Sequence, residues 1–343
     1  MITTERPAAV DGPPAPGGTR PRFRTEVGLV AGFVVLAGYV TWPLAAHATT
    51  KVAHDLGDPL ANTWILGWGA HAVTAQPRAL FHANYFFPSR FSLAFAENLL
   101  GLSVPLAPIF WLSSNPVLLM NVATILVLAA AGWAVHALVR ESTGNRAAGV
   151  VAGIIYTAAP YRVGAITHLH VVATHLLPLV LLVALRLTRR PRWSTAALLG
   201  TLLAAQLWSS LTGGILTFAA LGAWGVWAVA VHRHRALLPL LQAGAGVVVG
   251  LVLSLPVLLT YTHARELNPS YEHPPSEVIE NSATPGSYLD PPRAGAVARA
   301  GYRWLADRFG ARGAPEQELF AGFVALAALL VALPLVVFRA PKR

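Results

Sequence analysis

Carboxylates in one polar stretch are the first residues of this chain that could do chemistry. Residues 51–101 combine Asp55, Asp58 and Glu97 with several Trp, Tyr, Asn and His residues. A carboxylate beside a membrane can serve as a general base, or it can hold a divalent cation near a phosphate-bearing ligand. We therefore take Asp58, Asp55 and Glu97 as candidate catalytic residues, with a divalent cation as the one cofactor that the site could use.

Each of these acids also has a structural interpretation. Asp58 is followed by Pro59 and a helical run, which is typical of a helix N-cap with proline in the first turn. Glu97 precedes an apolar run and would complement the dipole of a helix that starts there. Asp55 would be an exposed loop acid. The cap and the catalytic role are compatible at position 58, because a cap also orients the carboxylate.

A second polar cluster occupies residues 160–175, PYRVGAITHLHVVATH. His168 and His175 are seven residues apart and would share one helical face, whereas His170 would point elsewhere. These spacings match no zinc signature, so no metal site is predicted. Arg162 could bind a phosphate or snorkel toward the interface. We take Arg162 and His168 as candidate substrate-binding residues.

Aromatic residues complete the candidate site. Trp64, Trp68 and His71 are spaced i, i+4 and i+7, which predicts one face of a short interfacial helix. Rings of this kind can line the sugar or lipid part of a ligand. Trp64, Trp68, Tyr85 and Asn62 are therefore added to the candidate substrate-binding residues.

The composition indicates an integral membrane protein. Of 343 residues, 55% are hydrophobic and 12% are charged, about half of the roughly 25% charged residues of soluble proteins. The chain has no cysteine, which excludes disulfides and thiolate sites. It has no P-loop, GxGxxG, GxSxG or HExxH motif, which weighs against an ATPase, a dinucleotide enzyme, a serine hydrolase and a metalloprotease.

Apolar runs predict an all-α integral membrane protein with about eight transmembrane helices. About 20 apolar residues cross a bilayer core of roughly 30 Å. Residues 1–26 are Pro- and Gly-rich and predict a disordered cytoplasmic tail, followed by one polytopic domain over 27–343. Two stretches, 60–76 and 98–113, are ambiguous and are interpreted as juxtamembrane helices in the first outer loop. The predicted spans are 27–46, 117–138, 147–160, 168–185, 194–209, 213–231, 236–261 and 319–338.

Loop charges predict the orientation. The loop 186–193 carries four arginines, and the positive-inside rule places it, with both termini, in the cytoplasm. Loops 47–116 and 262–316 then face outward from the plasma membrane. Residues 294–309 are amphipathic and predict a helix on the outer leaflet. Because the net charge of +10 segregates by loop, it does not indicate a nucleic-acid partner.

This layout resembles the GT-C superfamily of polytopic glycosyltransferases, which use polyprenyl-phosphate sugars. Residues 138–162 are similar to the second inner loop and third helix of those enzymes. A narrower resemblance, to a bacterial group of GT-C-like membrane proteins, rests on residues 57–68, 85–101, 161–179, 282–292 and 315–326.

The resemblance implies an inverting sugar transfer on the outer face of the membrane. The partners would be a polyprenyl-phosphate-linked sugar, the lipid bilayer and an acceptor that the sequence does not identify. The implied catalytic acid falls on Asp58, with Asp55 and Glu97 as its neighbours, and Arg162 would balance charge on the lipid phosphate.

Two alternatives remain open at this point. The chain could be a non-catalytic membrane protein, either a transporter of a lipid-linked glycan or a structural partner of an envelope complex. The near absence of acids within the predicted spans disfavours an ion-coupled transporter. It could also be a degenerate member of the family.

Overall fold

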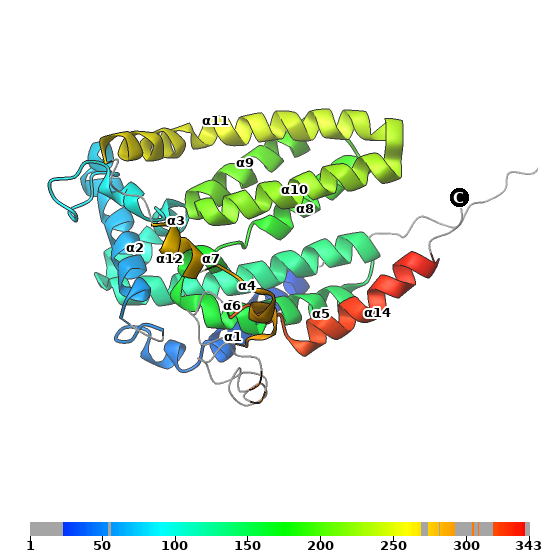
Figure 1. Cartoon of the computed structure of the whole chain (residues 1–343), viewed down its shortest axis with the longest axis horizontal. Coiled ribbons are helices and arrows are strands. Elements are labelled where there is room, and N and C mark those ends of the chain that lie inside the picture. Colours follow the sequence, from blue (N-terminus) through cyan, green and yellow to red (C-terminus); the bar gives the residue numbers. More distant parts are fainter. Residues whose placement is uncertain are drawn as a thin grey trace, which may run out of the picture.

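Every regular element among the described residues is a helix (Figure 1). This computed structural model describes residues 23–53, 56–268, 274–280, 282–291, 304, 308 and 318–339. The α-helices are α1 (Phe23–Val40), α2 (Asp58–Ala75), α3 (Leu100–Ser113), α4 (Pro116–Thr143), α5 (Arg146–Thr157), α6 (Pro160–Gly164), α7 (Leu169–Val172), α8 (Leu177–Arg189), α9 (Trp193–Ser209), α10 (Leu211–His232), α11 (Leu237–Leu267), α12 (Pro275–Glu280) and α14 (Phe323–Arg339). Short 3₁₀ turns are η1 (Leu44–His47), η2 (Pro77–Ala79), η3 (Ser92–Phe95), η4 (Ala165–Thr167), η5 (Arg233–Ala236) and η6 (Pro285–Leu289).

Several of these helices are long and apolar enough to cross a bilayer, as in a helical membrane protein. Among the described residues there are five, namely α1, α4, the stretch Leu169–Arg189, α10 and α11. A sixth results if the pair Arg146–Thr157 and Pro160–Thr167, bent by 43°, counts as one span. Helix α9 has 17 residues, and the described apolar part of α14 is Phe323–Ala332. Both are shorter than the roughly 20 residues that cross a bilayer core. The predicted count of about eight spans therefore stays a prediction.

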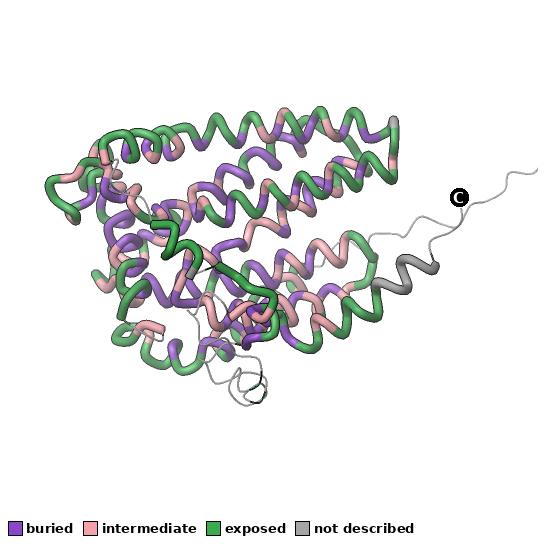
Figure 2. The backbone as a smooth tube through the Cα atoms, viewed as in Figure 1, coloured by how far each residue is buried: buried purple, intermediate pink, exposed green. Residues whose placement is uncertain are grey.

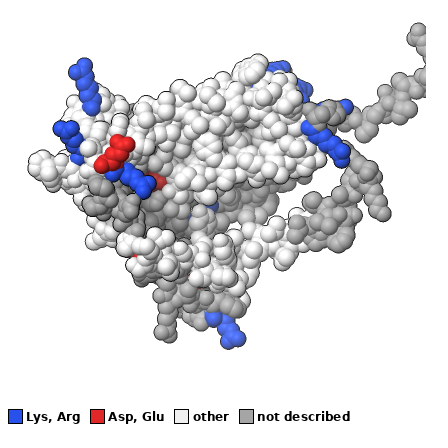
Figure 3. Space-filling model, turned by 45° about the horizontal axis from the view of Figure 1, so that its top comes forward, with Lys and Arg blue, Asp and Glu red and all other residues white. Residues whose placement is uncertain are grey.

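The two ends of the bundle differ in character. Turns between α4 and α5, α8 and α9, and α10 and α11 lie at one end, here called the basic end, which holds most of the described arginines. The other end, here called the loop end, holds α2, α3 and the segments 41–53, 56–57, 76–99 and 158–176. Figure 3 shows that the surface over α9–α11 is uncharged between these ends. This is the distribution expected of helices that face lipid along their middle.

The described core falls into three clusters. Buried apolar residues of α2, α3, α4 and α7 form one cluster at the loop end, and residues of α8–α11 form another. A smaller one joins α1, α4 and η4 through Phe33, Ala37, Leu128, Ala129 and Ile166. Figure 2 shows the buried faces turned inward along these helices. Among the helices of the second cluster α9 and α11 approach closely, because a Cβ at Gly200 would lie 2.5 Å from the carbonyl oxygen of Gly246. Small residues permit such close helix packing in membranes.

Asparagines at the start of α4 position the polar segment that leads into α2. Asn115 caps α4 by accepting a hydrogen bond from the amide of Leu118 at 2.9 Å. The buried Asn121 donates to the carbonyl oxygens of Ala48 and Lys51, both at 2.8 Å. The segment 48–51 is therefore tied to α4 by hydrogen bonds from an asparagine side chain to its carbonyl oxygens.

The ambiguous stretches are both helices, and neither qualifies as a span. In Figure 1 α2 runs across the loop end of the bundle. Ten of its 18 residues are buried, and it packs against α3 and α4. Its position at the membrane interface stays a prediction.

Helix boundaries differ from the prediction at several points. The first helix begins at Phe23 and ends at Val40, so residues 23–26 are helical. The predicted span 168–185 corresponds to the candidate span Leu169–Arg189, but within it α7 ends at Val172 and α8 begins at Leu177. Residues 1–22 of the predicted tail and nearly all of the predicted helix 294–309 lie outside the described residues.

Candidate functional site

An aspartate–histidine pair lies at the loop end, where α2 meets α7. Asp58 Oδ2 and His168 Nε2 are 2.8 Å apart. The other ring nitrogen of His168 lies 2.8 Å from Thr167 Oγ1, and Asn62 Nδ2 donates to the carbonyl oxygen of Thr167 at 3.2 Å. The Asp58 side chain is 56% exposed, whereas that of His168 is 16% exposed. The carboxylate is thus accessible from outside while the imidazole behind it is fixed.

The predicted N-cap at Asp58 is wrong. Gly57 occupies the cap position and makes no side-chain cap, while Asp58 is the first residue of α2. The Asp58 carboxylate turns to His168, which lies 110 positions later in the chain. Its negative charge still lies in the first turn of α2, where the helix dipole favours an anion.

His170 extends this pair into a larger polar group. The rings of His168 and His170 meet edge to face with centroids 6.0 Å apart. Asp58 and Glu97 both lie within electrostatic range of His170. The structure therefore brings two of the predicted acids and two histidines into one region at the loop end.

Glu97 is held by the N-terminus of α10. Its two carboxylate oxygens accept hydrogen bonds from the amides of Leu211 at 2.7 Å and Thr212 at 2.9 Å, and from the Thr212 hydroxyl at 2.7 Å. The predicted complement to a helix dipole is therefore present, but the helix is α10 and not α3, the helix that directly follows Glu97. The first turn of α3 is served by Asn98, whose side chain accepts from the amide of Leu100 at 2.9 Å.

Arg162 is buried and its contacts are internal. It is 1% exposed, and its guanidinium lies 4.5 Å from the centre of the Tyr156 ring. It donates to the carbonyl oxygen of Val172 at 3.0 Å and to Thr174 Oγ1 at 3.1 Å. Among the described residues no carboxylate pairs with it. Arg162 therefore fastens the turn after α7 to α5.

His175 and Asp55 are the two remaining candidate polar residues. His175 lies in the turn between α7 and α8, so it does not share a helical face with His168 as predicted. The helix is broken there because Pro178 lies in the first turn of α8, a position where proline starts a helix more readily than it continues one. Asp55 lies outside the described residues.

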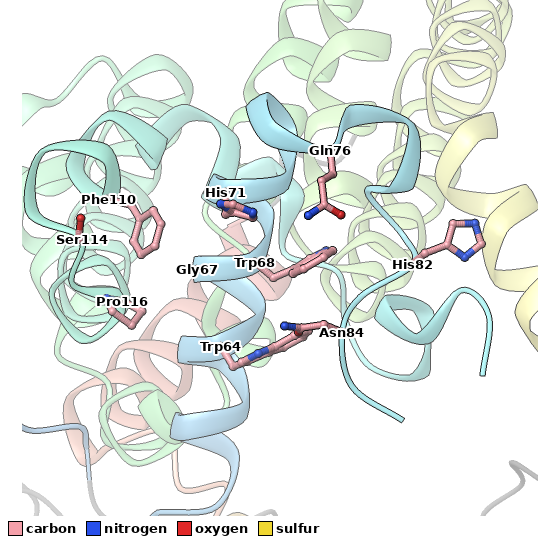
Figure 4. A pocket seen from close by; sticks show the side chains of 10 residues that line it. All are labelled: Trp64, Gly67, Trp68, His71, Gln76, His82, Asn84, Phe110, Ser114 and Pro116. Atoms are coloured by element: carbon pink, nitrogen blue, oxygen red, sulfur yellow. The ribbon is translucent and has the colours of Figure 1, made fainter. Parts of the chain in front are cut away.

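Trp64 and Trp68 line a pocket on another side of α2. The pocket has a volume of about 570 Å³, and none of the described residues that line it is Asp58, His168, His170 or Glu97. The two indole rings are nearly parallel, with centroids 5.9 Å apart, and the Tyr85 ring packs against Trp64 at 4.4 Å. Figure 4 shows both indoles beside the carboxamides of Gln76 and Asn84.

The described residues offer no obvious metal site. No three His, Asp or Glu side chains among them gather closely enough to hold a metal ion. The rings of His168 and His170 lie next to each other. Both ring nitrogens of His168, the atoms that would bind a metal, already contact Asp58 and Thr167. We therefore derive no chemical step through a divalent cation.

Sequence reasoning missed four contributors to these sites, namely His170, Gln76, Asn84 and Asn121. His170 was assigned to the wrong face because the segment was taken as one continuous helix. Gln76 and Asn84 follow the end of α2 and carried no periodic signal. Asn121 is an isolated buried amide within an apolar helix, and such a residue is itself a signal, because a buried polar group needs a partner.

In comparisons with known proteins, no family model, no curated protein and no solved structure matches this chain. The resemblance to the GT-C superfamily therefore remains a prediction from the sequence.

Proposed function

We propose that the protein is a GT-C-like glycosyltransferase, which moves a sugar from a polyprenyl-phosphate donor to an acceptor at the outer face of the plasma membrane. The observation that carries the proposal is the exposed Asp58 carboxylate, held 2.8 Å from His168 at the loop end. A fixed carboxylate in reach of a membrane-borne substrate is what general-base catalysis requires.

In this proposal Asp58 acts as the base. The acceptor hydroxyl attacks the anomeric carbon of the donor sugar from the face opposite the phosphate, and its proton passes to Asp58. The bond between the anomeric carbon and the phosphate oxygen breaks, and polyprenyl phosphate leaves with the electron pair. His168 orients the carboxylate through the contact between its Nε2 and Asp58 Oδ2.

The other predicted residues take supporting roles. Glu97 holds α10 through its three hydrogen bonds, and Arg162 holds the turn after α7. A contact between Arg162 and the donor phosphate stays a prediction, and it would require the guanidinium to leave Val172 and Thr174.

The membrane arrangement is part of the proposal. Counting the bent pair, α9 and α14 as spans gives about eight, with both termini in the cytoplasm. The support for this orientation is the gathering of arginines at the basic end, because such loops are retained on the cytoplasmic side. The loop end then faces outward.

The test uses purified protein in lipid nanodiscs and a panel of synthetic polyprenyl-phosphate monosaccharides. Release of polyprenyl phosphate is measured, with and without added glycan acceptors. With the donor that is used, Asp58→Asn should lower turnover by about 10²–10⁴-fold. Glu141→Gln at the basic end is the matched control and should leave turnover unchanged.

Two outcomes would contradict the proposal. Full turnover by Asp58→Asn would remove the proposed base. No release from any donor of the panel would favour a non-catalytic protein, either a transporter or a structural partner.

A further inference from the structure

The pocket beside α2 is chemically distinct from the Asp58–His168 pair. Its volume of about 570 Å³ lies within the roughly 300–1,000 Å³ of small-molecule sites. None of the described residues that line it is Lys, Arg, Asp or Glu. The lining therefore offers a cation no counter-charge, and it offers a phosphate no Lys or Arg but only the histidines His71 and His82.

The walls of the pocket are mostly apolar and combine aromatic rings with a few polar side chains. Trp68 is fixed because its Nε1 donates to the carbonyl oxygen of Leu80 at 2.8 Å. Trp64 lies nearly parallel to it, so the two indoles form one rigid apolar platform. Rigid aromatic faces of this kind provide contact area without a large loss of side-chain entropy.

Hydrogen-bonding groups stand beside this platform. Gln76 and Asn84 follow α2, and neither carboxamide bonds to another described residue. Each offers two donors and an acceptor, and His71 offers a further ring nitrogen. A lipid chain in the pocket would leave these groups without partners, at a cost for each one that becomes buried.

We propose that this pocket binds a neutral saccharide. A sugar ring carries one apolar face of C–H groups, which suits the Trp64–Trp68 platform, and a rim of hydroxyls, which suits the carboxamides of Gln76 and Asn84. It carries no charge, in keeping with a lining that has no Lys, Arg, Asp or Glu among its described residues. This site does not depend on the proposed transferase activity, because none of the residues assigned to catalysis lines it.

The test is a direct binding measurement on the full chain. The protein is placed in phosphatidylcholine nanodiscs, since alkyl-glycoside detergents would themselves present a sugar. Saturation-transfer difference NMR is recorded with methyl glycosides of glucose, galactose, mannose and N-acetylglucosamine, and with methyl glucuronide as an anionic counterpart. We expect at least one neutral glycoside to bind in the roughly millimolar range and the glucuronide to bind more weakly.

Variants connect this binding to the pocket. Trp64→Leu should weaken binding of that glycoside by about tenfold, and Asn84→Leu should weaken it as well. Trp42→Leu is the matched control, because Trp42 is exposed and does not line the pocket, and it should bind like the wild type. Asn84 is exposed, so its replacement keeps the test valid if Trp64→Leu fails to fold.

The outcomes separate this proposal from the preceding one. Asp58→Asn should bind the glycoside like the wild type, whether or not it retains turnover. The pocket proposal is overturned if no neutral glycoside binds, if the glucuronide binds best, or if Asn84→Leu and Trp64→Leu bind as well as Trp42→Leu.

Discussion

Two carboxylates at the basic end, Glu26 and Glu141, are each shared between two arginines, whereas two at the loop end, Asp58 and Glu97, meet a histidine or backbone amides. At the basic end Glu26 pairs with Arg140 and Arg146. Glu141, also at that end, pairs with Arg186 and Arg189. At the loop end Asp58 pairs with His168, and Glu97 caps α10.

This difference separates structural acids from chemically available ones. An arginine keeps its proton under all ordinary conditions, so Glu26 and Glu141 each face two fixed positive charges. Asp58 instead has an imidazole as its partner, and its side chain is more than half exposed. The basic end therefore ties α1, α4, α5 and α8 together, and the loop end is where proton transfer can occur.

The prediction with the largest expected effect tests whether the two ends lie on opposite sides of the membrane. A reporter that is active only in the cytoplasm should give full signal when fused after Arg190, and no signal when fused after Ser276. The physical reason is retention of the arginine-rich loop on the cytoplasmic side. Reporter activity in whole cells measures this, and the reverse pattern would move the loop end to the cytoplasm.

The next prediction asks whether His168 acts through Asp58. His168→Gln should lower donor turnover by about 100-fold, because a carboxylate displaced by about 1 Å loses its alignment with the substrate. The double variant with Asp58→Asn should be no slower than Asp58→Asn alone, since the two residues then form one functional unit. Losses that multiply in the double variant would instead indicate an independent, structural role for His168.

The positions of the helices could be predicted because apolar runs carry that information. The predicted spans 117–138 and 236–261 correspond to α4 and α11. In a bilayer, a long apolar run has to form a helix that satisfies its own backbone. The break between α7 and α8 was missed although Pro178 marks a helix start, because apolar length was given more weight than proline.

The partners of the site residues could not be predicted in the same way. Glu97 caps a helix that begins 114 positions later, and Asp58 meets a histidine 110 positions away. Local patterns name a residue that needs a partner but do not say which distant element will supply it. The choice is made by tertiary packing, as the absence of the expected cap at Asp58 shows.

The third prediction concerns how much the ion pairs at the basic end contribute to the free energy of unfolding. Glu26→Gln should lower the free energy of unfolding by about 1.5–3 kcal/mol, because hydrogen bonds between partly buried charged groups are lost and two arginines remain. Denaturant titration in mixed micelles measures this. Glu141→Gln is the control, and as a more exposed pair it should cost about 0–1 kcal/mol. If both variants lost the same free energy of unfolding, burial would not determine how much these ion pairs contribute to stability.

The smallest expected effect concerns Glu97, the loop-end acid that behaves as a structural residue. Glu97→Gln keeps one oxygen acceptor but points an NH₂ group at the amides of α10, so stability should fall by about 0.5–2 kcal/mol, the usual cost of a lost cap. Turnover per folded molecule should stay near that of the wild type, because both carboxylate oxygens are already engaged. Unfolding and donor turnover are measured on the same preparation. If turnover fell by 10²-fold or more without a loss of stability, Glu97 would belong with Asp58 as a second catalytic acid, and the loop end would hold two acids for chemistry instead of one.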